Sequence, residues 1–155
     1  MSPEELRTHL STLFGGKLRP LDSGRDAPLF ELAATELVET VRGLRDDETV
    51  GFDFLNCISC IDTGERMEIV YSLSSISHSH RLDLKIVLPR DGAEVDSVIE
   101  IWPAANWYER EIWELYGIQI RNHPNLTRFL LPDDWDQGHP MRKDWDAPDF
   151  VRMPE

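Results

Sequence analysis

Residues 67–88 read MEIVYSLSSISHSHRLDLKIVL, and this stretch decides the fold. Its large apolar side chains fall on every second position: Met67, Ile69, Tyr71 and Leu73, then Leu82, Leu84, Ile86 and Leu88. A period of two is typical of a β-strand with one buried face, and the serine- and histidine-rich residues 74–80 are typical of a turn. The stretch therefore predicts two antiparallel strands joined as a hairpin.

The sequence on both sides extends this pattern. Alternation at Val50, Phe52 and Phe54 predicts a third strand, which reaches a turn at residues 62–64. Helices are predicted over residues 3–14, which follow a Ser2–Glu5 capping box, over residues 29–44 and from Pro103 to Gly117. The expected buried positions of these helices are Leu6, Leu10 and Leu13, then Phe30, Ala34, Leu37, Val41 and Leu44, then Ala104, Tyr108, Ile112 and Leu115. The order helix, helix, strands, helix predicts an α+β domain with two layers, in which helices pack on a mainly antiparallel sheet.

The sequence changes character after Gly117. Five of the ten prolines fall in residues 118–155, where no hydrophobic period persists. The same residues carry large apolar side chains: Phe129, Leu130, Leu131, Trp135, Trp145 and Phe150. A long segment without regular structure that still carries such groups usually lies against a surface. We therefore divide the chain into a domain over residues 1–117 and an extended partner-binding segment over residues 118–155, with packing on its own domain as the alternative.

Composition excludes several classes of function. The 155 residues include 29 acidic and 16 basic side chains, for a formal net charge of −13. A protein that neutralises phosphates needs the opposite balance, so nucleic-acid binding is disfavoured. No apolar run approaches the roughly 20 residues of a membrane helix, and residues 1–5 lack the features of a signal peptide. The expectation is a protein outside the secretory pathway that does not insert into a membrane itself.

Few residues suggest chemistry. Cys57 and Cys60 have a C-x-x-C spacing, but on a strand their sulfur atoms point to opposite faces, which favours inert thiols over a redox or metal site. His78 and His80 share a strand face that could bind a metal, although the serine-rich surroundings favour exposed loop histidines. The carboxylates of Glu109, Glu111 and Glu114 lie on one predicted helix with Arg110, and they favour a solvated or partner-binding face over acid–base catalysis. Without a catalytic or nucleotide-binding motif, these residues favour a binding or assembly subunit.

Residues 102–117, WPAANWYEREIWELYG, resemble the signature of the 30 kDa subunit of respiratory complex I. Glu114 stands where that signature usually has Asp. Three downstream stretches also resemble the family: residues 123–126 (HPNL), 130–135 (LLPDDW) and 138–144 (GHPMRKD), although Leu is commoner than Met141. The resemblance covers residues 30–150, and Cys57 and Cys60 lie outside its motifs.

The resemblance implies a cofactor-free peripheral-arm subunit of a proton-translocating NADH:quinone oxidoreductase, on the cytoplasmic face of the inner membrane or its organelle equivalent. It implies that the chain braces the quinone-reducing module beside the 49 kDa subunit and neighbouring iron–sulfur subunits. FMN and the iron–sulfur clusters would belong to other subunits, and this chain would hold no metal and no active site. The partner-binding residues expected on this basis are Trp107, Glu109, Arg110, Glu111, Glu114, His123, Arg128, Trp135, Arg142 and Lys143.

Two other interpretations remain open at this point. The first is a homologous subunit of a membrane-bound [NiFe] hydrogenase or formate hydrogenlyase, because those complexes share this module. The second is a stand-alone metal enzyme that uses His78, His80 and Glu111, which ranks far behind because the sequence gives these residues no reason to converge.

Overall fold

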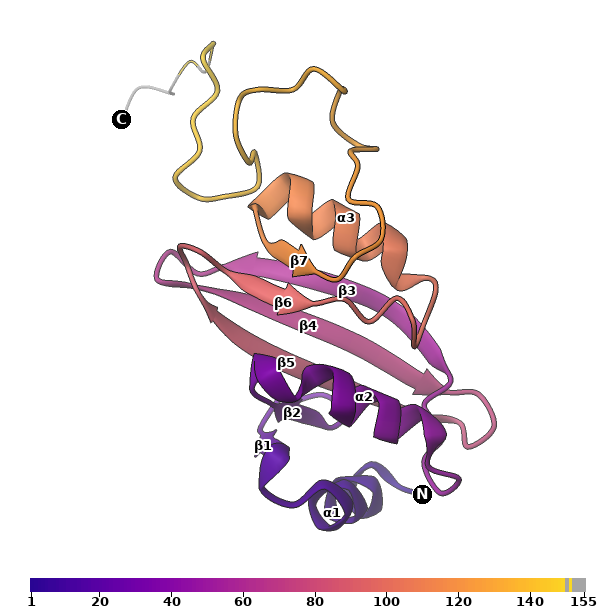
Figure 1. Ribbon diagram of the computed structural model, residues 1–155. Helices are drawn as coiled ribbons and strands as arrows, with labels where there is room; N and C mark the ends of the chain where they lie inside the picture. The colour runs from indigo at the N-terminus through magenta and orange to yellow at the C-terminus, as the bar shows by residue number, and fades with distance from the viewer. Residues whose placement is uncertain (150, 152–155) are drawn as a thin grey trace.

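A five-stranded sheet forms the centre of the computed structural model, which describes residues 1–149 and 151 (Figure 1). The strand order is β1-β2-β5-β4-β3, and all pairs are antiparallel except β2 with β5. The strands are β1 (Arg19–Leu21), β2 (Leu29–Glu31), β3 (Phe54–Asp62), β4 (Arg66–Ser75) and β5 (His80–Pro89). The predicted α+β class and mainly antiparallel sheet are therefore confirmed, as is the hairpin of residues 67–88.

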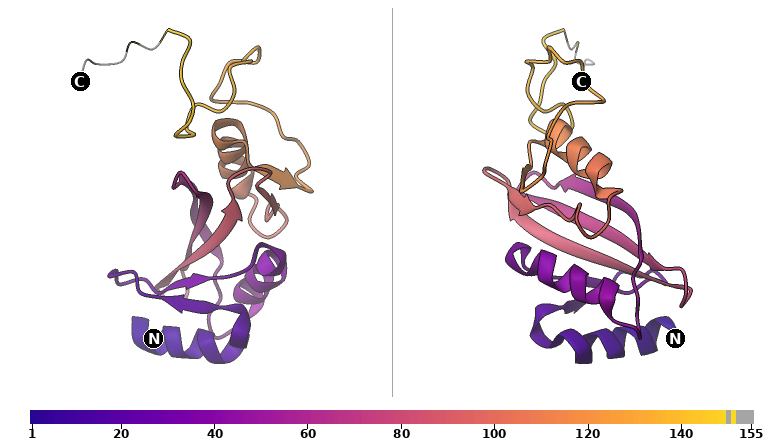
Figure 2. Two further views of the ribbon diagram at one scale, coloured as in Figure 1. Left: turned by 90° about the vertical axis from the view of Figure 1, so that its left-hand side faces the viewer. Right: turned by 45° about the vertical axis from the view of Figure 1, so that its right-hand side comes forward.

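Three α-helices accompany the sheet: α1 (Pro3–Phe14), α2 (Leu37–Asp46) and α3 (Ala105–Tyr116). Short 3₁₀ turns, η1 (Gly15–Lys17) and η2 (Ala34–Glu36), follow α1 and precede α2. The alternate residues of β4 and β5 that the sequence marked as apolar are all buried, and they join the buried residues of all three helices in one core. Figure 2 shows α1 at the end of the molecule away from α3. The last described residues of the chain lie beyond α3.

The predicted start of α1 is confirmed. Ser2 accepts a hydrogen bond from the backbone amide of Glu5 (3.2 Å), and the Glu5 carboxylate accepts one from the amide of Ser2 (2.7 Å). Leu6 and Leu10 are buried as expected, whereas Leu13 is 43% exposed. The side chain of Phe14 lies against Gly43 of α2, where an added Cβ atom would be 3.1 Å from its ring. The capping box therefore begins a helix that packs closely on α2.

The predicted helix over residues 29–44 is wrong at its beginning. Residues 29–31 form β2, which pairs in parallel with residues 83–85 of β5, and α2 starts only at Leu37. Phe30 is fully buried in this arrangement. Because a strand also buries Phe30, the apolar spacing could not separate the two structures, and pairing with the free edge of β5 decided the outcome.

Two further strands, β6 (Glu94–Asp96) and β7 (Gln119–Arg121), pair in parallel and form a small second sheet. In the sequence, β6 precedes α3 and β7 follows it. The sequence did not predict them. Their central residues, Val95 and Ile120, are buried. The first residues after Gly117 therefore belong to a sheet, and the chain without regular structure begins only after Arg121. Phe150 and residues 152–155, at the end of the predicted partner-binding segment, lie outside the described residues.

Candidate functional site

Helix α3 is the platform of the candidate site. It ends at Gly117, whose φ of 77° lies in the left-handed region that favours glycine. The predicted buried stripe of this helix is confirmed at Ile112, and Tyr108 packs half-buried against the core. It is wrong at Ala104, which is exposed, while Ala105 and Glu109 are buried in its place. We call residues 122–149 the strap: they leave β7, lie along α3 and extend past it on the side away from α1 (Figure 1).

Arg110 of α3 holds the first part of the strap by its main chain. Its Nε donates to the carbonyl of Thr127 (2.8 Å), and its Nη2 donates to the carbonyl of Arg128 (3.3 Å). Its guanidinium also lies over the rings of Trp107 and Phe129, 4.9 and 5.0 Å from their centroids. Those two rings meet edge to face at 5.3 Å. Arg110 thus joins a helix aromatic residue, a strap aromatic residue and the strap backbone.

Glu114, one turn further along α3, makes the complementary contact. Glu114 is 3% exposed, and its carboxylate accepts hydrogen bonds from the backbone amides of Leu130 (3.0 Å) and Leu131 (3.1 Å). The backbone carbonyl of Glu114 also accepts a hydrogen bond from Nδ1 of His139 (3.0 Å). A buried carboxylate needs such donors to offset its lost hydration, so Glu114 fixes the path of the strap at this point.

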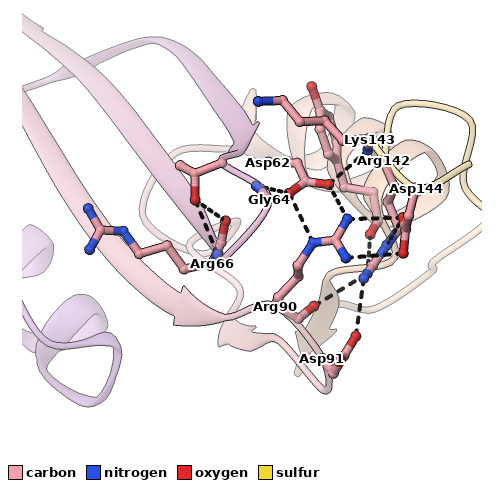
Figure 3. A network of polar contacts seen from close by, with 10 residues as sticks. Asp62, Gly64, Arg66, Arg90, Asp91, Arg142, Lys143 and Asp144 are labelled. Carbon is pink, nitrogen blue, oxygen red and sulfur yellow. Dashed lines mark hydrogen bonds and ion pairs between the residues drawn. The ribbon is translucent and has the colours of Figure 1, made fainter.

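A second attachment lies at the tips of β3 and β5 (Figure 3). The buried carboxylate of Asp62 accepts two bonds from Arg90, from Nε (3.1 Å) and Nη2 (2.8 Å). It accepts two more from backbone amides, those of Gly64 and of Lys143 in the strap, both at 2.8 Å. Hydrogen bonds from Arg90 lead the causes that hold the pKa of Asp62 far below its usual value. Asp62 therefore remains ionised and connects the sheet to the strap.

Strap side chains close the same network from the other side. Asp144 pairs with the Arg90 guanidinium at 3.0–3.1 Å. Arg142 donates to the carbonyls of Arg90 (3.4 Å) and Tyr116 (3.5 Å), and its Nη2 lies 3.2 Å from an oxygen of Asp91 (Figure 3). Strap residues 142–144 are thus joined to both strand tips and to the end of α3.

Two tryptophans stabilise the strap, Trp135 between the two attachments and Trp145 directly after the second. The rings of Trp135 and Trp145 lie 6.2 Å apart. Their indole nitrogens donate to the carbonyls of Gly138 and Gln137 respectively. These contacts close a loop without regular secondary structure, which gives the strap a defined shape beyond α3.

Large apolar side chains remain at the surface of this region. Trp107 is 54% exposed, Phe129 38%, Leu130 53% and Met141 52%. Phe129, Leu130 and Met141 belong to the strap, and Trp107 of α3 packs edge to face on Phe129. Exposed apolar groups gathered on one region typically mark a contact with another molecule. We call these four side chains the strap surface.

Glu109 has a different position, inside the domain. It is 1% exposed and accepts hydrogen bonds from the hydroxyl of Ser97 (2.6 Å) and the amide of Val98 (2.7 Å). Nε2 of the buried His123 ring lies 3.9 Å from its Oε2 atom. Burial raises the pKa of Glu109 to about 7, against the two hydrogen bonds, which lower it. This carboxylate therefore gains or loses a proton near neutral pH.

Among the described residues, no group of three or more His, Cys, Asp or Glu side chains could hold a metal ion. Cys57 and Cys60 lie on opposite faces of β3, as predicted; Cys57 is half-exposed and Cys60 buried. Burial, and then the charge of Asp62, raises the pKa of Cys60 to about 12, so its thiol is unreactive. The rings of His78 and His80 stack at 5.5 Å, and each Nε2 contacts a backbone carbonyl. In residues 1–149 and 151, no helix is long and apolar enough to span a bilayer.

The ten residues that the sequence singled out fall into two groups. Five bind the interior of the domain or its connection to the strap through their side chains: Glu109, Arg110, Glu114, His123 and Arg142. The other five are at least partly exposed around α3 and the strap: Trp107, Glu111, Arg128, Trp135 and Lys143. Three of these five, Trp107, Arg128 and Trp135, also contact their own chain. The sequence missed Asp62 and Arg90 as members of the site and assigned Asp62 only to a turn. The sequence gives only a weak signal for this pair. The proximity of two opposite charges at strand ends can be recognised only once the register of the strands is known.

Comparison with known proteins gives a consistent picture. The family model described as "Respiratory-chain NADH dehydrogenase, 30 Kd subunit" matches residues 30–151. The NADH-quinone oxidoreductase C subunit of Chloroherpeton thalassium is 36% identical over 85% of this chain and 56% of its own length. The proteins of that name from Acidothermus cellulolyticus and Acidithiobacillus ferrooxidans are each 38% identical, over 80% and 97% of this chain and 66% and 78% of their own lengths. The chain therefore spans less than two thirds of the first two relatives.

Two solved structures share the fold. A chain of the membrane-bound sulfane sulfur reductase, an archaeal respiratory membrane complex, aligns with a TM-score of 0.79 and 22% identity, over 94% of this chain and 86% of that chain. A trypsin-resistant fragment of Nqo5 aligns with a TM-score of 0.68 and 24% identity, over 81% of this chain and all of the fragment. At these identities the likeness concerns the fold alone.

Proposed function

Since the chain belongs to the family of the 30 kDa subunit of respiratory-chain NADH dehydrogenase, we propose that it is a structural subunit of a proton-translocating NADH:quinone oxidoreductase. In this proposal it braces the quinone-reducing module in the peripheral arm, beside the homologue of the 49 kDa subunit and neighbouring iron–sulfur subunits. FMN and the iron–sulfur clusters belong to other subunits. The chain attaches through these partners to the cytoplasmic face of the inner membrane, or its organelle equivalent.

The observation that carries the proposal is the way the strap is held. Side chains of α3 and of the strand tips bind its backbone at residues 127–131 and 143. The side chains of the strap surface are left exposed. The proline-rich strap is thus held in one path while its large apolar groups face outward. This arrangement favours recognition of another protein, because a pre-ordered segment loses less entropy on binding.

The ten expected docking residues take two roles in this proposal. Trp107, Glu111, Arg128, Trp135 and Lys143 lie at the surface and contact the partner directly. Glu109, Arg110, Glu114, His123 and Arg142 act within the chain and position the strap. Removing a member of the second group should therefore alter docking through the path of the strap.

The test uses a tagged full chain that replaces the native copy in its own organism. Purified from solubilised membranes, it should bring partner subunits and NADH:quinone reductase activity. The double variant Phe129→Ser/Leu130→Ser should recover at least tenfold less of both, because it removes two apolar groups of the strap surface. The matched control is Ile76→Ser on the β4–β5 turn, a 68% exposed apolar residue outside the strap surface, which should leave recovery unchanged. Isolation of the wild-type chain without partners contradicts the proposal.

A second candidate is a homologous subunit of a related membrane complex that does not oxidise NADH, such as a [NiFe] hydrogenase or formate hydrogenlyase. The fold likeness to a chain of an archaeal respiratory membrane complex favours keeping it. The names of the curated relatives favour the NADH-linked enzyme. The same preparation separates the two, since hydrogen evolution without NADH oxidation would support the second candidate.

A further inference from the structure

The side chains of Glu109 and His123 meet inside the domain where the strap begins. Glu109 belongs to α3, and His123 follows β7 by two residues. Both side chains are essentially inaccessible to solvent, at 1% and 0% exposure. Oε2 of Glu109 and Nε2 of His123 are 3.9 Å apart, which is beyond hydrogen-bond distance. The two side chains therefore pack α3 against the first residues of the strap, with no hydrogen bond between them.

The hydrogen bonds around the pair define which atoms carry protons. Nδ1 of His123 accepts a hydrogen bond from the amide of Asn125 (3.1 Å), so a neutral ring carries its proton on Nε2. That Nε2 atom has no hydrogen-bond partner among the described residues. The hydroxyl of Tyr71, fully buried on β4, has none among them either. On the other side, Ser97 and Val98 donate to the two oxygens of Glu109.

Burial and nearby charges shift the pKa values of the titratable groups at this site. Burial raises the pKa of Glu109 to about 7, and burial lowers the pKa of His123. The Asn106 carbonyl acts to raise the pKa of His123, and the positive charge of Arg110 acts to lower it further. The pKa of Tyr71 is raised well above its usual value by burial, then by the charges of Glu109, Cys60 and Asp96, so the phenol stays neutral. Glu109 thus exchanges a proton near neutral pH.

We propose that Glu109, Ser97 and His123 form a buried proton-binding site that sets how tightly the strap is joined to the domain. When Glu109 binds a proton, its neutral carboxyl group can remain buried and the His123 ring stays packed against it. When Glu109 is ionised, its negative charge has two donors, Ser97 and Val98, and recovery of its lost hydration requires the His123 ring to move aside. The beginning of the strap is therefore held more tightly below pH 7 than above it. This property belongs to the chain itself and does not depend on which complex it joins.

Nuclear magnetic resonance of the full chain tests the proposal. The side-chain carboxyl carbon of Glu109 and the backbone amides of residues 123–126 are followed from pH 5 to 9. The expected result is one shared transition near pH 7, in which the amides move with the carboxyl group. In Glu109→Gln the transition of these amides should disappear, while Glu111→Gln, an acid of the same helix, should retain it.

Three results would overturn the proposal. The first is titration of Glu109 below pH 5.5, as an ordinary exposed glutamate does. The second is an amide transition that persists unchanged in Glu109→Gln. The third is a carboxyl transition near pH 7 without movement of residues 123–126. If Glu109→Gln does not fold, the wild-type titration decides alone, because it compares the carboxyl and the amides in one molecule. None of these outcomes depends on recovery of partner subunits, so the test is separate from that of the proposed function.

Discussion

Arg90 holds Asp62 in a two-point contact, with Nε 3.1 Å from Oδ1 and Nη2 2.8 Å from Oδ2. The same guanidinium also reaches Asp144 of the strap, and the remaining hydrogen-bonding positions of Asp62 are filled by the backbone amides of Gly64 and Lys143. One buried ion pair thus joins two strand ends to a strap segment that lies far along the chain. Its charge-assisted hydrogen bonds to the Lys143 amide and to Asp144 link the domain to the strap.

The first prediction concerns the charge of Asp62. Asp62→Asn keeps the size of the side chain but loses the ion pair and replaces one acceptor oxygen with an NH₂ group facing a donor. The free energy of unfolding of the full chain should fall by about 2 kcal/mol, measured by chemical denaturation. The control Glu65→Gln changes an exposed acid in the same turn and should have almost no effect. Equal losses in both variants would contradict a specific role for Asp62.

The second prediction is the pH dependence of that loss. Because Arg90 lowers the pKa of Asp62 from 3.8, the carboxylate stabilises the fold at any pH above 3.8, and this stabilisation disappears as the pH falls toward the folded-state pKa. The stability difference between wild type and Asp62→Asn should be constant from pH 5 to 8 and shrink below pH 4. Chemical denaturation at a series of pH values measures this stability difference. A difference that grows as the pH falls would contradict the prediction.

The third prediction has the opposite sign. Burial raises the pKa of Glu109 from 4.5 to about 7, so its folded state binds a proton more tightly than its unfolded state. The stability that this contributes is fully present below pH 4.5 and is lost as the pH rises through 7. Relative to Glu109→Gln, the wild type should gain up to about 1.4 kcal/mol per unit as the pH is lowered from 7 to 5. Comparison with the variant also removes the opposing contribution of His123.

The fourth prediction concerns Glu114 and the strap backbone. Glu114→Gln leaves one oxygen for two amides, so one of the Leu130 and Leu131 amides faces an NH₂ group. Hydrogen exchange at these two amides should accelerate roughly 10-fold, while exchange in β4 and β5 remains unchanged. Glu111→Gln, on the same helix, is the control. Unaltered exchange would mean that other contacts hold the strap at this position.

The fifth prediction isolates the contact at Gly117. An added Cβ atom there would lie 2.7 Å from the ring of His139 and would also require a left-handed backbone. Gly92→Ala requires a similar backbone, with φ at 66°, but its Cβ atom would meet nothing within 4 Å. Both variants should lose about 1 kcal/mol from the backbone. Gly117→Ala should lose more and should accelerate hydrogen exchange around His139, whereas similar losses would show that the strap adapts at no cost.

The sequence predicted those parts of the fold that depend on neighbouring residues. The Ser2–Glu5 capping box, the alternation along β4 and β5 and the end of α3 at Gly117 are local signals, and each was confirmed. The start of α2 was wrong because Phe30 fits a helix and a strand equally well, and only the edge of β5 distinguishes them.

The site was less accessible to such reasoning. Glu109 and Glu114 are buried although an acidic helix face is usually solvated, because their partners come from Ser97, Val98 and the strap. Those partners lie 11 to 17 residues away in the sequence. The apolar side chains of the strap predicted a partner surface, with packing on its own domain as the alternative. The structure shows the strap backbone held by α3 and the strand tips, while a partner contact stays a prediction.

The use of backbone atoms at both attachments has a consequence for how this protein can diverge. Arg110, Glu114 and Asp62 bind carbonyl and amide groups that every residue other than proline provides in full. Substitutions at residues 127–131 can therefore accumulate without rerouting the chain. The side chains that the strap exposes can therefore change one at a time, provided that Arg110, Glu114 and Asp62 are kept.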